Sequence, residues 1–206
     1  MYIVRSDVTV NGGRFAGLEA WTTQRVEHLR AQKGFQEYLV LRSLGYPGNA
    51  ANLVAWENRE NSLAYLESPE RQLFVQANPY SALFTLNRPE EAHELVHEVA
   101  RPGQAGIATL VDWNINPGVV NAAAFESARK ELFELRREHS KGFVSNRLLK
   151  FLGAPSRYLV VMLWRSVDDY RAAQAIPQIQ EFGRTHSGQY ATTPRAHEYH
   201  EVRRQA

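Results

Sequence analysis

Residues 34–74 read GFQEYLVLRSLGYPGNAANLVAWENRENSLAYLESPERQLF, and residues 142–182 read GFVSNRLLKFLGAPSRYLVVMLWRSVDDYRAAQAIPQIQEF. A constant offset of 108 residues, from Gly34 to Gly142, aligns the two stretches without a gap. The identical pairs include Phe35/Phe143, Leu41/Leu149, Leu44/Leu152, Gly45/Gly153, Pro47/Pro155, Trp56/Trp164, Ala64/Ala172, Pro69/Pro177, Gln72/Gln180 and Phe74/Phe182. Two tryptophans, two Gly-Phe pairs and several Gly/Pro positions in one register indicate a tandem duplication.

Each half shows the same order of expected elements. Alternating apolar residues predict strands, and an apolar stripe at helical spacing predicts the first helix of each half. Asn58 and Ser166 are expected to cap the second helices, which Pro69 and Pro177 interrupt. The first half gives strand 1–10, helix 14–32, strands 35–44 and 51–57, a broken helix from residue 58, and strand 92–100. The second half gives strand 107–115, helix 118–140, strands 143–152 and 157–165, helix 166–186 and strand 196–203.

The order βαββαβ, found twice, predicts an α+β fold of two ferredoxin-like units in tandem. We expect the units to span residues 1–102 and 103–206. One face of each antiparallel sheet is covered by two helices, and the other face needs a cover. The two sheets are therefore expected to pack together as an intrachain pseudo-dimer, and further homo-oligomers remain open.

Residues 93–97, HELVH, match a zinc-protease signature that requires a helix. The repeat argues for a strand here, because PRAHEYHEVRR at 194–204 matches this region with one residue fewer between its histidines. A strand absorbs such a change as a β-bulge, whereas a helix would rotate the second histidine away. Histidines at i and i+4 on a strand lie about 13 Å apart and cannot share one zinc ion. We expect no metal site, and we expect His93, His97, His197 and His200 to be solvated or interfacial.

Composition limits the classes of function. The chain has 206 residues, 44% hydrophobic residues and a formal net charge of +2. Its basic residues are spread out, so no nucleic-acid surface is expected. There is no cysteine, which excludes thiol nucleophiles and fits a reducing compartment. Arg5 and Asp7 interrupt any apolar signal sequence, and no run is long enough for a membrane helix. These features predict a soluble cytoplasmic protein.

The run G-F-x5-L-x2-L-G-x-P, followed by a strand ending in Trp and a helix broken at Pro, resembles the antibiotic biosynthesis monooxygenase family. The resemblance covers both halves. It implies a dimeric α+β barrel with a pocket between sheet and helices in each half. The family includes cofactor-free enzymes that oxidise electron-rich phenols to quinones, which suggests a monooxygenase that needs neither metal nor flavin.

The resemblance also implies candidate catalytic residues. Quinone-forming members use a strand Trp, an Asn four residues earlier and a Tyr six residues later, whose polar groups stabilise a phenolate oxyanion. The first half offers Asn52 and Trp56 but has Ser62 at the Tyr position. The second half offers Trp164 and Tyr170 but has Val160 at the Asn position. The two pockets are therefore expected to differ, although the tryptophans could simply be core residues and Asn52 could simply end a turn.

Two alternatives stay open. Haem-degrading relatives ligate iron through a helical His preceded by a Trp, but Tyr65 and Phe74, and Ala173 and Phe182, occupy those positions here. Phenylalanine cannot ligate iron, and His186 lies one helical turn beyond Phe182. The non-enzymatic alternative is an α+β barrel that binds a hydrophobic metabolite. In neither the oxygenase nor the binding hypothesis is a cofactor expected.

Overall fold

The computed structural model describes residues 1–13, 15–46, 48–87, 89–116, 118, 121–190 and 198–205. The first half contains β1 (Tyr2–Val10), a 3-10 turn η1 (Asn11–Gly13), α1 (Phe15–Arg30), β2 (Phe35–Ser43), β3 (Asn49–Trp56), α2 (Arg59–Glu67), α3 (Pro69–Ala77), β4 (Phe84–Leu86) and β5 (Glu91–Ala100). The second half contains β6 (Ile107–Asn114), α4 (Ala122–His139), β7 (Phe143–Phe151), β8 (Arg157–Trp164), α5 (Val167–Gln174), α6 (Pro177–Tyr190) and β9 (Glu198–Gln205). The predicted fold class, two βαββαβ repeats with antiparallel strands, is confirmed.

The HELVH segment lies within the strand β5, as the repeat predicted. His93 and His97 therefore follow strand spacing and cannot bind one metal ion together. Among the described residues, no group of three His, Cys, Asp or Glu side chains is placed to hold a metal. His197 lies outside the described residues.

Internal contacts divide the chain into two compact units. Unit 1 contains Met1–His93 and Val202–Ala206, and unit 2 contains Glu94–Glu201. The division falls inside β5 and inside β9. The predicted repeat boundaries, 1–102 and 103–206, rest on the internal sequence repeat and stay a prediction.

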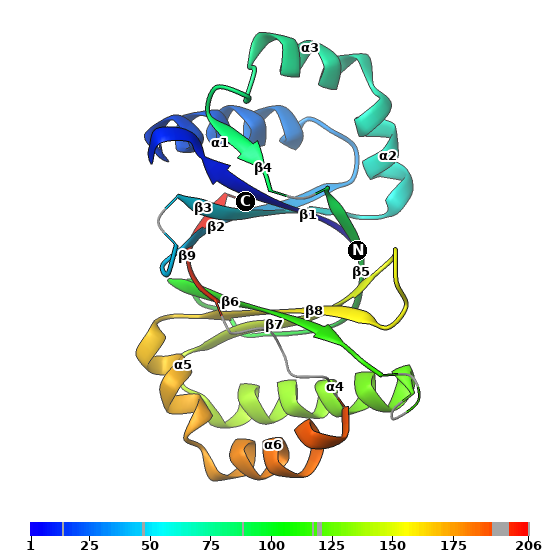
Figure 1. Cartoon of the computed structure of the whole chain (residues 1–206), viewed down its shortest axis with the longest axis vertical. Helices are drawn as coiled ribbons and strands as arrows, with labels where there is room; N and C mark the ends of the chain where they lie inside the picture. The colour runs from blue at the N-terminus through cyan, green and yellow to red at the C-terminus, as the bar shows by residue number, and fades with distance from the viewer. Residues whose placement is uncertain are drawn as a thin grey trace. The chain divides into compact units, whose positions relative to one another are not determined.

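In unit 1, β1 pairs antiparallel with β3 and with the short β4, and β2 pairs antiparallel with β3. Helices α1, α2 and α3 cover one face of this sheet (Figure 1). Apolar side chains of α1 pack onto that face beside Trp56 and Tyr65 in one cluster. A second cluster surrounds Trp21 and includes Phe84 of β4. Burial of these apolar faces is the main force holding the layers together.

Unit 2 repeats this arrangement. Strand β8 pairs antiparallel with both β6 and β7, and β6 pairs with the first residues of β9. Helices α4, α5 and α6 lie on one face of this sheet (Figure 1). The main cluster on that face includes Trp164, Tyr170, Phe125 and Met162.

Local features repeat between the units at equivalent positions. The side chains of Asn58 and Ser166 accept hydrogen bonds from the backbone N–H groups of Asn61 and Asp169, which confirms both predicted N-caps. The ladders β2–β3 and β7–β8 each have a register shift at their start, between Phe35/Glu37 and between Phe143/Ser145. The prolines Pro69 and Pro177 begin α3 and α6, so the predicted helix breaks are confirmed.

Gly34 shows why each repeat carries a glycine before its second strand. Its φ is +77°, and a Cβ atom there would lie 2.0 Å from Nδ2 of Asn61 and 2.8 Å from its Cβ. We expect Gly34→Ala to destabilise the protein by about 1–3 kcal/mol, because overpacking adds to the cost of the left-handed backbone. Gly12→Ala is the control, because Gly12 has φ +59° but open space around it. Urea unfolding measures both variants, and equal losses would show that the contact with Asn61 is unimportant.

Two expectations need correction. The sequence did not predict β4, which pairs with the end of β1 through three residue pairs. A three-residue strand has too little alternation to be recognised by pattern. His93 and His200 were expected to be solvated or interfacial, and their exposed fractions are 1% and 3%. The solvated alternative is therefore wrong for both residues.

Candidate functional site

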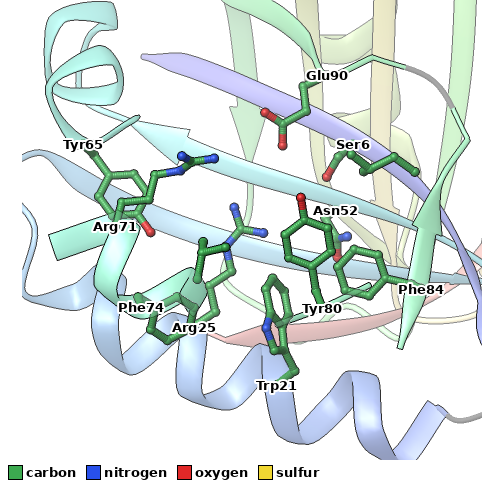
Figure 2. Close-up of a pocket in the computed structure, with 12 residues that line it drawn as sticks. Ser6, Trp21, Arg25, Asn52, Tyr65, Arg71, Phe74, Tyr80, Phe84 and Glu90 are labelled. Atoms are coloured by element: carbon green, nitrogen blue, oxygen red, sulfur yellow. The ribbon is translucent and has the colours of Figure 1, made fainter. Parts of the chain in front are cut away.

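Unit 1 contains a cavity of about 40 Å³ between the sheet and its helices (Figure 2). The sheet contributes Ser6 and Asn52, and the helices contribute Trp21, Arg25, Tyr65 and Arg71. The cavity is lined by Ser6, Trp21, Arg25, Asn52, Tyr65, Arg71, Phe74, Val75, Tyr80, Phe84, Leu86 and Glu90. Apolar walls with a few convergent polar groups are typical of small-molecule sites.

Asn52 is the polar group of the sheet face. It lies in the middle of β3, opposite Ser6 of β1 and Val40 of β2. Its side chain is 1% exposed, and its Oδ1 atom has no hydrogen-bond partner. An unpaired buried amide oxygen costs about 1–3 kcal/mol. The turn explanation for Asn52 therefore fails, and a ligand or water in the cavity is needed to satisfy this amide.

Positive charge collects on the helix side of the cavity. Figure 2 shows Arg25 of α1 and Arg71 of α3 extending into the space beside Tyr65. Arg25 is half-buried, and its guanidinium lies over the rings of Trp21, at 5.1 Å, and Tyr38, at 5.4 Å. Glu90 is the one acidic residue of the lining, and it is exposed. The two cations make the cavity suited to an anionic ligand.

Tyr65 supplies a phenol at the site. Burial raises the pKa of its hydroxyl, while the cations of Arg25 and Arg71 act in the opposite direction. Tyr65 is therefore protonated at neutral pH and can donate a hydrogen bond to an anion. Tyr65 lies on α2. Ser62, three residues earlier, occupies the position at which the family resemblance implies a tyrosine.

Aromatic rings form the apolar wall. Trp21 contacts Phe84 at a centroid distance of 5.2 Å, Tyr80 at 6.0 Å and Phe74 at 6.3 Å. Tyr80 stacks on Phe84 at 5.0 Å. The indole N–H of Trp21 donates to the carbonyl of Asn78, which fixes the ring. Such a wall suits a flat aromatic ligand.

Trp56 lies beside this cavity. It lines a smaller space of about 20 Å³ that shares Arg25, Tyr65 and Glu90 with the first cavity. Its ring contacts Tyr65 at a centroid distance of 5.2 Å, and its exposed fraction is 2%. Asn52 and Trp56 therefore lie on one face of β3 as predicted, but they line adjoining spaces.

The second predicted pair lies in unit 2. The rings of Trp164 and Tyr170 meet edge to face at 5.7 Å, inside the main cluster of that unit. Trp164 is fully buried, and its indole N–H has no hydrogen-bond partner. Val160, at the position equivalent to Asn52, belongs to the same cluster. The predicted difference between the two pockets stays a prediction.

Sequence reasoning missed Arg25, Arg71, Tyr65, Trp21 and Tyr80. One signal was available, because Arg25 lies four residues after Trp21 and so on the buried stripe of α1. The buried positions of α4 repeat those of α1 with an offset of 107, from Leu18 to Phe125. At this offset Leu132 occupies the position of Arg25, so unit 2 has no cation at this position, and the buried arginines of α4 are Arg129 and Arg136.

Phe74 occupies the position in unit 1 at which the haem-degrading relatives carry the ligating histidine. Phe74 lines the cavity and stacks on His28 at 4.6 Å, but its ring has no ligating atom. In unit 2, His186 stacks on Phe182 at 4.1 Å, with its Nδ1 atom 3.2 Å from the Phe182 carbonyl oxygen. Separately, none of the described helices is long and apolar enough to cross a membrane.

Comparison with known proteins confirms the resemblance found in the sequence. Residues 1–77 match the family model described as antibiotic biosynthesis monooxygenase. These residues contain Asn52, Trp56 and most of the residues that line the cavity. No curated protein matches the sequence.

Solved structures share the fold at low sequence identity. A candidate monooxygenase from Fusobacterium nucleatum matches with a TM-score of 0.79 and 9% identity, over 99% of this chain and 93% of that one. A candidate monooxygenase from Lactobacillus acidophilus gives a TM-score of 0.70 and 10% identity, over 98% and 93%. An anthrone oxidase-like protein gives 0.59 and 11% identity, over 99% and 92%. At these identities the likeness establishes the fold alone.

Proposed function

We propose that this protein is a cofactor-independent monooxygenase whose working site is the cavity of unit 1, and that it oxidises a small acidic phenol or enol. The observation that carries the proposal is the unpaired amide of Asn52, buried in a cavity that also holds Arg25 and Tyr65. The monooxygenase-type family match over residues 1–77 supports it. In this proposal the protein acts in the cytoplasm, on a metabolite that is present there.

The lining fits the chemistry of such a substrate. Oδ1 of Asn52 can accept a hydrogen bond from the neutral phenol, and Nδ2 can donate one to the phenolate. Arg25 favours the phenolate by lowering the substrate pKa. The electron-rich anion then reacts with O₂, so that a CH₂ group becomes C=O and the second oxygen atom leaves as water. Donors that are fixed before reaction stabilise the oxyanion without reorganisation.

The other predicted residues take defined roles in this proposal. Trp56 holds Tyr65 through ring contact and borders the substrate from the adjoining space. Trp164 and Tyr170 are the corresponding candidates in unit 2, where both are buried in the main cluster. The cavity of about 40 Å³ is smaller than the roughly 150 Å³ that holds benzene in a protein core. Substrate entry therefore requires lining side chains to move, and Leu86 and Glu90 are the exposed members.

Oxygen uptake with a panel of anthrones and hydroquinones tests the function. With the anthrones, which carry the CH₂ group that is oxidised, we expect consumption of one O₂ for each quinone formed, without added metal or flavin and in the presence of a chelator. Hydroquinones have no such group, and their oxidation by O₂ would release hydrogen peroxide instead of water. The control is the Arg25→Leu variant, which removes the cation that this site needs. Saturable binding of panel members without oxygen uptake would contradict catalysis and favour the non-catalytic binding protein.

A further inference from the structure

A row of polar side chains crosses the helix-facing surface of the unit 2 sheet. Thr109 of β6 and Asn146 of β7 lie directly opposite Met162 of β8, one on each side. Residues opposite one another in antiparallel strands point to the same face. Met162 belongs to the core cluster under α4, so Thr109 and Asn146 also face the helices. Both are 0% exposed.

Arg136 of α4 reaches down to this row. Its Nη1 atom lies 2.8 Å from Sδ of Met162, and the residue is 7% exposed. Burial lowers the pKa of its guanidinium to about 10, so it stays a cation at neutral pH. No ion pair with a carboxylate is present for Arg136 among the residues that the structure describes. A buried cation without a counter-ion is expensive.

Trp164 completes the group. It is two residues beyond Met162 on the same face, and diagonal neighbours on adjacent strands lie about 7–8 Å apart. Trp164 is therefore a diagonal neighbour of Asn146 on this face of the sheet. The atoms without a hydrogen-bond partner in this small region are Oγ1 of Thr109, Nδ2 and Oδ1 of Asn146, Nε of Arg136 and Nε1 of Trp164.

These four side chains carry more hydrogen-bond donors than acceptors. Arg and Trp side chains can only donate, whereas Asn and Thr can donate and accept. Each buried polar group without a partner costs about 1–3 kcal/mol, and native proteins rarely leave several together. A hydrogen-bond acceptor with negative charge would satisfy the donors and neutralise Arg136 at once.

Unit 1 carries fewer polar groups at the equivalent place. The equivalent row is Val4, Val54 and Tyr38, with the same register. Position 29 of α1, equivalent to Arg136, is a fully buried leucine. The duplicated copy therefore fills the same place with two valines, a leucine and the ring of Tyr38, whose buried hydroxyl is its one polar group. The fold thus forms without an amide or a cation at this place.

We propose that unit 2 holds a closed binding site for a small monovalent inorganic anion of chloride or bromide size, formed by Thr109, Arg136, Asn146 and Trp164. The anion accepts hydrogen bonds from the guanidinium, the amide, the hydroxyl and the indole N–H. The site is separate from the cavity of unit 1 and does not depend on the proposed oxygenase activity.

Thermal unfolding in sodium chloride, bromide and gluconate at constant ionic strength tests this site. Gluconate is too large to enter. At about five times the dissociation constant, bound chloride or bromide should raise Tm by about 2–4 °C relative to gluconate. Arg136→Leu, which introduces the unit 1 residue, should abolish this difference and should not lower Tm in gluconate. Arg137→Leu is the control, because Arg137 is an exposed neighbour paired with Glu134 at 2.7 Å, and it should keep the difference.

Bromide diffraction locates the anion independently of stability. Crystals soaked in bromide should show an anomalous peak between Arg136 and Asn146. A water molecule at that place in bromide, together with equal Tm values in all three salts, would overturn the proposal. So would an Arg136→Leu variant that is less stable in gluconate and retains the full halide effect.

Discussion

Replacing Asn52 by valine should lower the turnover number about 10²–10³-fold, while the protein remains as stable as the wild type or becomes more stable. Loss of one donor aimed at a developing oxyanion typically reduces the rate by this factor. Stability should not suffer, because Oδ1 of Asn52 is already buried without a partner. Valine also stands at the equivalent position in unit 2, residue 160, and β-branched residues suit strands.

The measurement combines oxygen uptake with urea unfolding on the same preparation. Asn49→Ala is the matched control, because Asn49 lies on the same strand but accepts a hydrogen bond from Thr9 and lies outside the cavity lining. Its rate should stay near wild type. If Asn52→Val retained full turnover, or lost activity only in proportion to lost folded protein, Asn52 would be a structural residue and the oxyanion role would be wrong.

The sequence predicted the fold well because its signals were redundant. The repeat placed the two tryptophans, the two helix-breaking prolines and the two N-caps in one register, and the structure shows each pair at equivalent positions. The repeat also decided HELVH, where local propensity favours a helix. The βαββαβ order needs a strand as its last element. This requirement of the topology overrides the weak local preference for a helix.

The site was only partly predictable. Asn52 follows from resemblance, because a strand residue four positions before a Trp shares its face. Arg25 and Tyr65 could be identified only once helices α1 and α2 were seated on the sheet, since sequence does not show which stripe residues meet across elements. The polar row of unit 2 was hidden for the same reason. Asn146 supplies an amide from β7, whereas the family resemblance points to position 160 of β8, which is a valine.

Replacing Arg25 by leucine should lower kcat/KM for a phenolic substrate about 10–100-fold and shift the acid limb of the pH–rate profile to higher pH. Hydrogen bonds to charged groups contribute about 1.5–3 kcal/mol, which gives the first figure. The direction of the shift follows from the charge. A nearby cation favours the ionised phenol and lowers its pKa, so removal of the cation raises that pKa and the reactive anion forms only at higher pH.

Leucine is the informative replacement because Leu132 occupies the equivalent buried position of α4, so the fold accepts it. The loss of the contacts between Arg25 and the rings of Trp21 and Tyr38 should cost about 0.5–1 kcal/mol of stability.

Arg25→Lys keeps the charge and should hold the acid limb close to its wild-type position, even if kcat/KM falls because the planar guanidinium is gone. The pH–rate profiles are measured as initial rates of oxygen uptake over about two pH units on either side of neutrality. An unshifted acid limb in Arg25→Leu would show that Arg25 does not act on substrate ionisation, and Arg71 would then be the remaining cation of the cavity to test.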